Sequence, residues 1–215
     1  MRECGKMGDN NLTTNSCIIT GEIYSEPELG HKSYGEGFYT FQIKVERLSG
    51  YCDIVPVTVS ERLIIDIDMK VKTLIQINGQ LRTYNKLEED KNRLIITVFA
   101  REINMVPPDE LIKNPNKIFL EGYVCKKPIY RLTPLGREIC DIMLAVNRAY
   151  NKSDYIPCIA WGRNAKFSQV LDVGAHIKIW GRIQSREYKK KIDEDTVETK
   201  IAFEVSILKM ESCEE

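Results

Sequence analysis

The residues of this chain best suited to hold a flat, charged partner lie in residues 158–191. This span holds both tryptophans, Trp161 and Trp180, and it ends with Tyr188 followed directly by three lysines. It also contains the arginines Arg163, Arg182 and Arg186. Aromatic rings stack on other flat rings, and cations pair with anions. The span therefore predicts a partner that offers both planar groups and negative charge.

The formal net charge of zero hides a strong segregation of charge along the chain. Residues 1–116 are net −3, residues 192–215 are net −6, and residues 117–191 are net +9, with 15 basic and 6 acidic side chains. A charged run is often only a solvated face. Here the basic excess extends over a whole segment and coincides with the aromatic rings. We therefore expect a polyanion as the partner, with nucleic acid as the first choice.

The elements that must position these residues come from a repeat of about one hundred residues. Glycines, prolines and charged residues recur at an offset of 101, and later at 102. The matched pairs are Gly21/Gly122, Pro27/Pro128, Val45/Val146, Arg47/Arg148, Asp53/Asp154, Pro56/Pro157 and Gly79/Gly181. The chain is thus predicted to contain two copies of one unit. The predicted division is a flexible N-terminus (1–15), domain 1 (16–106), a Pro/Asn-rich linker (107–116), domain 2 (117–210) and a short acidic C-terminus (211–215).

Each copy has the alternating apolar pattern of short β-strands. In the second copy the predicted strands are 117–124, 138–147, 154–161, 176–183 and 201–208, with one helix at 163–171 whose apolar side is Phe167, Val170 and Leu171. Glycines within the first and fourth strands, Gly122 and Gly181, suit tight bends. Five strands with one helix between the third and fourth predict an all-β protein of two tandem OB-fold five-stranded barrels, each with one short helix.

Three kinds of chemistry are not expected. The chain has no Ser-His-Asp or Cys-His constellation, P-loop or HExxH motif, so we predict no enzyme activity and no cofactor. The seven cysteines form no CxxC pair and the two histidines, His31 and His176, are far apart, which predicts no metal site. The sequence contains no run of about 18 apolar residues, so we predict no membrane-spanning helix.

The second copy also resembles a known family. The runs "IFLEGYVCKKPIYRLTPLGREICDIMLAVNR", "SDYIPCIAWGRNA" and "VGAHIKIWGRIQSREY" are similar to the DNA-binding domain of bacterial single-stranded DNA-binding proteins, over nearly all of residues 117–210. That resemblance implies bases stacking on Tyr150, Tyr155, Trp161 and Tyr188. It further implies phosphate contacts from Arg131, Arg137, Arg148, Lys152, Arg163, Arg186 and Lys189.

Some of these aromatic residues have a second interpretation. Tyr155 and Trp161 could instead be part of the core, since large aromatics are usually partly buried. Trp180 and Lys178 alternate with Ile177 and Ile179 and so are expected to point outward. The resemblance places them at an assembly interface between barrels. Local packing, or contact with DNA, remains an alternative for Trp180.

The first copy departs from the family pattern. At the matching offsets the four ring positions are Ser49, Ile54, Ser60 and Lys86. Domain 1 is therefore expected to be structural or dimerising, although Tyr34, Tyr39, Tyr51 and Tyr84 could form a different platform. Family members commonly assemble with four barrels, so two barrels in one chain imply a homodimer. We do not expect the family's usual acidic tail with a terminal phenylalanine, and the acidic stretch Asp193–Glu198 is expected to be a solvated turn.

These observations predict non-catalytic, largely sequence-independent binding of single-stranded DNA in replication, recombination or repair. The alternative is a tandem OB-fold adapter between proteins, or a primosome-type accessory, with weak binding of nucleic acid. Free cysteines suit a reducing compartment, so the expected location is the cytoplasm, in association with the nucleoid. Replication and repair proteins are candidate protein partners, although we do not expect them to be recruited through the family's usual acidic tail tip.

Overall fold

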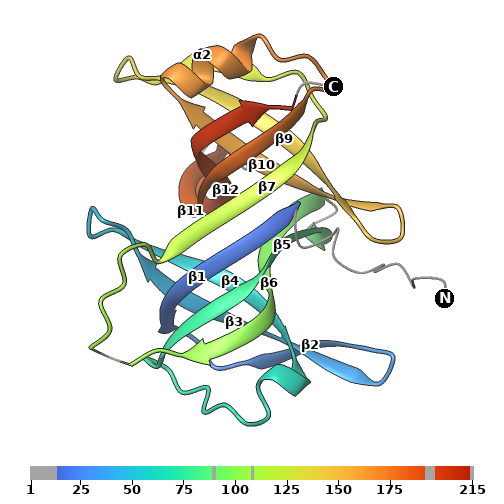
Figure 1. Cartoon of the computed structure of the whole chain (residues 1–215), viewed down its shortest axis with the longest axis vertical. Helices are drawn as coiled ribbons and strands as arrows, with labels where there is room; N and C mark the ends of the chain where they lie inside the picture. The colour runs from blue at the N-terminus through green and yellow to red at the C-terminus, as the bar shows by residue number, and fades with distance from the viewer. Residues whose placement is uncertain (1–13, 89–90, 108, 192–196, 214–215) are drawn as a thin grey trace, which may run out of the picture.

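The computed structural model describes residues 14–88, 91–107, 109–191 and 197–213. Two β-barrels lie one above the other, with the second barrel uppermost in Figure 1. Most of the predicted flexible N-terminus, most of the acidic stretch Asp193–Glu198 and the last two residues lie outside the described residues. No helix among the described residues has the length and apolar character needed to span a bilayer.

Each barrel is a closed ring of five strands with one extra strand at its side. The first barrel consists of β1 (Asn15–Ile23), β2 (Glu28–Ser33), β3 (Glu36–Glu46), β4 (Cys52–Ser60), η1 (Glu61–Leu63), β5 (Leu74–Glu88) and β6 (Lys91–Met105). The second consists of β7 (Asn116–Val124), β8 (Ile129–Leu132), β9 (Glu138–Arg148), β10 (Lys152–Trp161), α2 (Arg163–Gln169), β11 (His176–Lys191) and β12 (Val197–Ser212).

The pairing of the strands closes both rings in the same order. In the first barrel β1 pairs with β3, β3 with β4, β4 with β6 in parallel, β6 with β5, and β5 with β1. The second barrel repeats this order with β7, β9, β10, β12 and β11. The predicted all-β fold of two tandem OB-fold barrels is confirmed. Strands β2 and β8 pair only with β3 and β9, and the sequence analysis did not predict β8.

The helices differ from the prediction in two ways. The first barrel has only the single 3₁₀ turn η1 among its described residues, whereas the second has α2. In α2 the buried residues are Ala165 and Ser168, while Phe167 and Val170 are exposed. The predicted apolar side was therefore wrong except for Leu171, which is buried just beyond the helix. Small residues face the barrel because they let the helix approach β9 closely.

A glycine in the fourth strand of each ring allows a close backbone approach. A Cβ atom on Gly181 would lie 2.4 Å from the carbonyl oxygen of Ser206, and one on Gly79 would lie 2.2 Å from that of Phe99. A β-bulge occurs at each of these two glycines. The strand bends there because no side chain intervenes, which is the role predicted for Gly181.

The two barrels share one continuous sheet through β1 and β7. These strands pair antiparallel from Asn15↔Leu120 to Ile19↔Asn116, and they run side by side at the centre of Figure 1. The backbone N–H of Thr20 donates to Pro115 O, and that of Glu121 donates to Thr14 O, both at 2.7 Å. These two bonds are related by the repeat offset of 101, so the junction has approximate two-fold symmetry.

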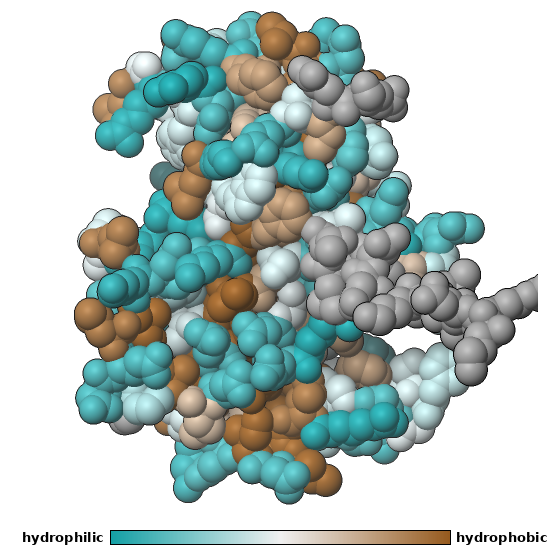
Figure 2. All heavy atoms as spheres, in the orientation of Figure 1, coloured by the Kyte–Doolittle hydropathy of each residue, from teal (hydrophilic) through white to brown (hydrophobic). Residues whose placement is uncertain are grey.

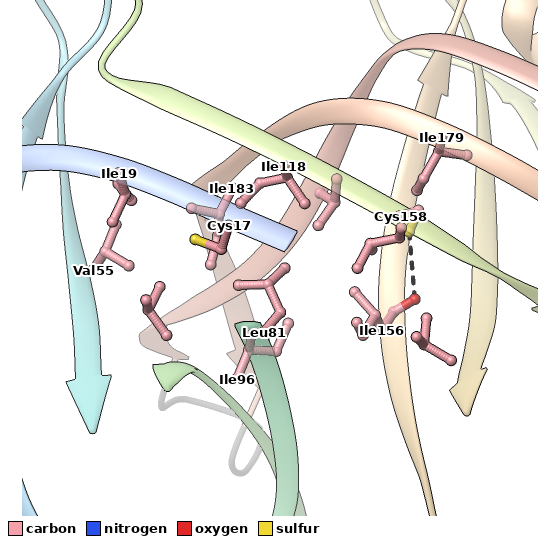
Figure 3. Packing of buried hydrophobic residues seen from close by; sticks show 14 of the residues in the cluster. Cys17, Ile19, Val55, Leu81, Ile96, Ile118, Ile156, Cys158, Ile179 and Ile183 are labelled. Atoms are coloured by element: carbon pink, nitrogen blue, oxygen red, sulfur yellow. Dashed lines mark hydrogen bonds between the residues drawn. The ribbon is translucent and has the colours of Figure 1, made fainter. Parts of the chain in front are cut away.

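The barrel interiors are filled mainly by aliphatic side chains and buried cysteines. Figure 3 shows Cys17 among isoleucines and leucine, and the contact between Cys158 Sγ and Ile156 O at 3.5 Å. Burial raises the pKa of the Cys17 thiol to about 12 and that of Cys140 to about 11. These thiols therefore act as small hydrophobic groups and not as nucleophiles.

On the face shown in Figure 2, exposed hydrophobic residues form separate patches within a hydrophilic surface.

Candidate nucleic-acid interface

Two of the predicted stacking rings lie on the outer face of β10. Tyr155 is 50% exposed and Trp161 is 38% exposed, whereas Asp154, Ile156, Cys158 and Ala160 point inward and are buried. Their partners across β9 are Ala145 and Ile139. Neither ring is sealed in the core, so both present surface to solvent from a rigid strand.

Tyr150 lies in the turn that joins β9 to β10 and is 95% exposed. Its φ is +61°, and the next residue, Asn151, has φ of +54°. Two consecutive residues with positive φ are typical of a type I′ hairpin turn, for which Asn-Gly is the usual sequence. A bulky residue in this region is strained by about 1–2 kcal/mol. A tyrosine held fully in solvent at such a position contributes nothing to the core, so its ring is available for a ligand.

Tyr188 lies on a different hairpin. It is half-buried on β11, opposite Lys200 of β12, and exposed Lys189 follows it. The structure thus brings Tyr150, Tyr155 and Trp161 onto one hairpin and places Tyr188 on a separate one.

The predicted phosphate contacts fall into two groups. Three are already paired with carboxylates: Arg131 with Asp141 at 2.7 Å, Arg186 with Glu204 at 3.2 Å and Arg148 with Asp154 at 3.6 Å. The other four are exposed and form no ion pair with any described residue: Arg137, Lys152, Arg163 and Lys189. The pair of Arg131 with Asp141 is exposed, and such a pair is worth only about 0–1 kcal/mol, so it holds the arginine weakly.

A cluster that the sequence analysis missed joins the two barrels around buried carboxylates. Asp53 of the first barrel is 0% exposed and receives two hydrogen bonds of 2.6 Å from Arg47. Its Oδ1 also accepts from the backbone N–H and the hydroxyl of Ser185 in the second barrel, both at 2.7 Å. Burial by itself raises the pKa of Asp53, but the hydrogen bonds from Arg47 and Ser185 outweigh it and hold the pKa below its usual value.

The same arrangement recurs on the other side of the junction. Asp154 of the second barrel is 0% exposed and accepts from Arg82 at 2.9 Å and from the backbone N–H of Thr83 at 2.8 Å, both in the first barrel. Asp53 and Asp154, like Arg47 and Arg148, match at the repeat offset of 101. That repetition was the available signal for a shared structural role, and it ties Arg148 to the junction between barrels.

The first barrel carries a hollow of about 760 Å³ that reaches the second barrel. Its lining consists of Gly30, His31, Thr40, Thr58, Arg82, Thr83, Tyr84, Lys86, Thr97, Phe99 and Arg148. No carboxylate is among these described residues, and three of them are cations. The hollow adjoins the second barrel's outer face because the backbone N–H of Tyr155 donates to Thr83 Oγ1 at 2.9 Å. Of the four tyrosines proposed as an alternative platform, only Tyr84 lines it.

Trp180 points outward from β11, as predicted, but it has partners within its own chain. Its ring lies 5.2 Å from that of Phe119, and Lys209 Nζ lies 4.6 Å above it. Lys178 is paired with Glu121 at 3.7 Å. These contacts fit the alternative of local packing, while a role in assembly stays a prediction.

Comparisons with known proteins find sequence relatives for the second barrel. A sequence model described as the single-strand binding protein family matches residues 115–210. The second barrel is therefore similar in sequence to the single-strand binding protein family. Single-stranded DNA-binding protein 1 of Staphylococcus aureus (strain COL) is 34% identical over 83 residues, which cover 35% of this chain and 50% of that protein. Single-stranded DNA-binding protein A of Bacillus subtilis (strain 168) is 30% identical over 96 residues, or 41% and 56% of the two chains.

The chain spans about half the length of the curated relatives that it matches. The wild-type single-stranded DNA-binding protein from Thermus aquaticus matches over 94% of this chain and 93% of its own, with a TM-score of 0.73 and 19% identity. At that identity the likeness shows the fold alone. It extends over both barrels, whereas the family's sequence match covers only the second.

Proposed function

We propose that this chain binds single-stranded DNA without catalysis and with little sequence preference, in replication, recombination or repair. The observation that carries the proposal is the set of three exposed rings, Tyr150, Tyr155 and Trp161, on one hairpin of a barrel that matches the single-strand binding protein family. Every base has a flat face, so stacking on such rings tolerates any sequence and contributes about 1–3 kcal/mol per base. Tyr188 is a fourth stacking residue in this proposal.

Exposed cations around the rings supply contacts to phosphates. Arg137, Lys152, Arg163 and Lys189 are the first choice because each is exposed and forms no ion pair with a described residue. Each phosphate that is neutralised on a single strand contributes about −0.7 to the slope of log K against log salt. Four contacts therefore predict a slope of about −3. Titration of oligo-dT at several salt concentrations measures it, and a slope near zero would contradict a role for these side chains.

The path of the strand in this proposal continues from Tyr155 into the hollow on the first barrel. Thr83 joins the two surfaces. Lys86, Arg82 and Arg148 lie along the lining, and the two arginines share the single carboxylate of Asp154, so this group keeps a net positive charge. Tyr84 is 49% exposed and offers a ring there. The first barrel thus contributes a second contact with the strand, although it lacks the family's four rings, in addition to the structural role that its sequence predicts.

Tryptophan fluorescence provides the deciding experiment. Trp180→Phe leaves Trp161 as the only tryptophan, so quenching by oligo-dT reports on that ring alone. We expect strong, salt-dependent quenching, and weaker affinity when Tyr155→Ala is added. Tyr24→Ala, an equally exposed tyrosine outside the interface, is the control. Absence of any binding would favour the adapter between proteins.

Two chains are proposed to assemble into a homodimer of four barrels, located where the DNA is, in the cytoplasm and its nucleoid. Trp180 and Lys178 are the candidate contacts for this assembly. Sedimentation equilibrium of the full chain is expected to give twice the mass of one chain. A monomer at all concentrations would overturn this part of the proposal and leave DNA binding untouched.

A further inference from the structure

We propose that Glu121, His176 and Cys213 bind a zinc ion on the outer face of the second barrel. Glu121 lies on β7, His176 begins β11 and Cys213 follows directly after β12. Although they are far apart in the sequence, one ligand atom of each residue lies within 4.8 Å of the other two. The sequence predicts no metal site because its cysteines form no CxxC pair and its two histidines are far apart.

The backbone of three adjacent strands fixes this arrangement. His176 pairs with Tyr123 and Lys178 pairs with Glu121 across β7 and β11, so His176 and Glu121 are diagonal neighbours on one face. The backbone N–H of Cys213 donates to His176 O at 2.9 Å, which anchors the third residue. The three side chains therefore converge without any long loop.

The donor set matches the chemistry of zinc. Imidazole nitrogen, thiolate sulfur and carboxylate oxygen are its usual protein ligands, and bonds of about 2.0–2.3 Å place tetrahedral ligand atoms about 3.3–3.6 Å apart. His176 Nε2 and Glu121 Oε1 are 3.1 Å apart. All three ligand atoms lie within 4.8 Å of one another, and the thiol of Cys213 loses its proton when it binds the ion.

Neighbouring groups orient two of the ligands. The ring of Tyr123 stacks on the imidazole of His176 with centroids 4.6 Å apart and 17° between the planes. Lys178 Nζ lies 3.7 Å from Glu121 Oε2, on the carboxylate oxygen that does not face His176. Glu121 Oε1 therefore stays directed at the imidazole of His176. The positive charge of Lys178 would repel the zinc ion and so weaken its binding.

The site is specific to the second barrel. By the strand register, the positions that match Glu121 and His176 in the first barrel are Thr20 and Leu74, and neither side chain is a usual zinc ligand. Three protein ligands leave one coordination position, which we assign to water. The ion would fasten the end of β12 to β7 and β11.

Competition with a chromophoric zinc chelator tests the proposal on the full chain after treatment with EDTA. Removing a residue that only hydrogen-bonds to a metal ligand lowers metal affinity by about 10–100-fold. Cys213 is itself a ligand in this proposal, so Cys213→Ser is expected to weaken zinc binding by more than about 100-fold. Cys52→Ser, another half-buried cysteine, is the control and should leave affinity unchanged. Lys178→Met is expected to strengthen binding because it removes the opposing charge.

A second measurement identifies the ligands and does not depend on the affinity for zinc. Cobalt(II) added to the unmodified chain should give a thiolate-to-cobalt charge-transfer band that is absent in Cys213→Ser and retained in Cys52→Ser. Glu121→Gln should weaken binding while circular dichroism shows an unchanged fold. Failure of the unmodified chain to compete for zinc, or equal binding by Cys213→Ser, would overturn the site. Binding of oligo-dT is measured separately, so this outcome is independent of the proposed function.

Discussion

At the candidate interface, a side chain that favours binding can be unfavourable for the stability of the fold. Tyr150 is the clearest case, because its positive φ is unfavourable for a bulky side chain and its ring is almost fully exposed. Trp161 and Tyr155 lie on a strand and need no such conformation. The hairpin tip therefore holds a ring at a conformational cost that packing does not offset.

We expect Tyr150→Gly to separate stability from binding. Glycine accepts a positive φ, so the free energy of unfolding should rise by about 1 kcal/mol. Loss of the ring should weaken binding of oligo-dT by about 1–3 kcal/mol. Urea unfolding and fluorescence titration measure the two effects, and a variant that is more stable and binds equally well would exclude Tyr150 from the interface.

The buried carboxylate of Asp53 predicts a pH dependence. Its pKa is lowered in the folded state, so its stabilising contribution is present above about pH 4, the unfolded value, and is lost as the pH falls through the folded value. Near neutral pH, Asp53→Asn should lower the free energy of unfolding by about 3 kcal/mol.

Urea unfolding at a series of pH values measures this difference. The gap between Asp53→Asn and the unmodified chain is expected to narrow below about pH 4. Asp141→Asn is the control, because Asp141 forms an exposed ion pair worth about 0–1 kcal/mol. A gap that stays constant under acid conditions would show that the charge of Asp53 is not what stabilises the junction.

At the scale of elements, the glycines at the two bulges decide how each barrel closes. Gly181→Ala would place a Cβ 2.4 Å from the carbonyl oxygen of Ser206, which must shift. We expect a loss of about 1–3 kcal/mol in the free energy of unfolding. Gly30→Ala is a milder comparison, because its nearest neighbour is a methyl group of Thr40 at 3.2 Å. Equal effects of the two substitutions in urea unfolding would contradict this account.

Elements with strong alternation were predictable from the sequence, and those set by tertiary contacts were not. The five ring strands of the second barrel follow from period-two patterns with β-branched residues. Strand β8 has only four residues and no buried side chain, so it leaves no such pattern. The buried side of α2 depends on the small residues Ala165 and Ser168, which a search for large apolar side chains overlooks.

The candidate interface was predictable where it depends on residue type and position in a hairpin. The hollow on the first barrel was not, because Arg148 reaches it from the other copy and Phe99 from a distant strand. Asp53 and Ser185 are 132 residues apart, so no local pattern links them. Only the repetition of Asp53 and Arg47 in the second copy indicated that they act together.

For the whole molecule, the hollow predicts that the first barrel takes part in binding. Tyr84→Ala should weaken binding of oligo-dT by about 1–3 kcal/mol if a base stacks on that ring. Tyr24→Ala has a similar exposure on the same barrel, lies outside the hollow and should bind normally. Equal affinity of both variants in fluorescence titration would restrict the path of the strand to the second barrel.

The pairing of β1 with β7 has a consequence for how the molecule behaves on dilution. Separate subunits that meet through such an edge must find each other by diffusion, and their contact weakens as concentration falls. Here the segment between β6, which ends at Met105, and β7, which begins at Asn116, joins the two barrels and keeps the two edges at a high effective concentration. The relative placement of the barrels, and any surface that spans them, is therefore independent of how many copies of the protein a cell contains.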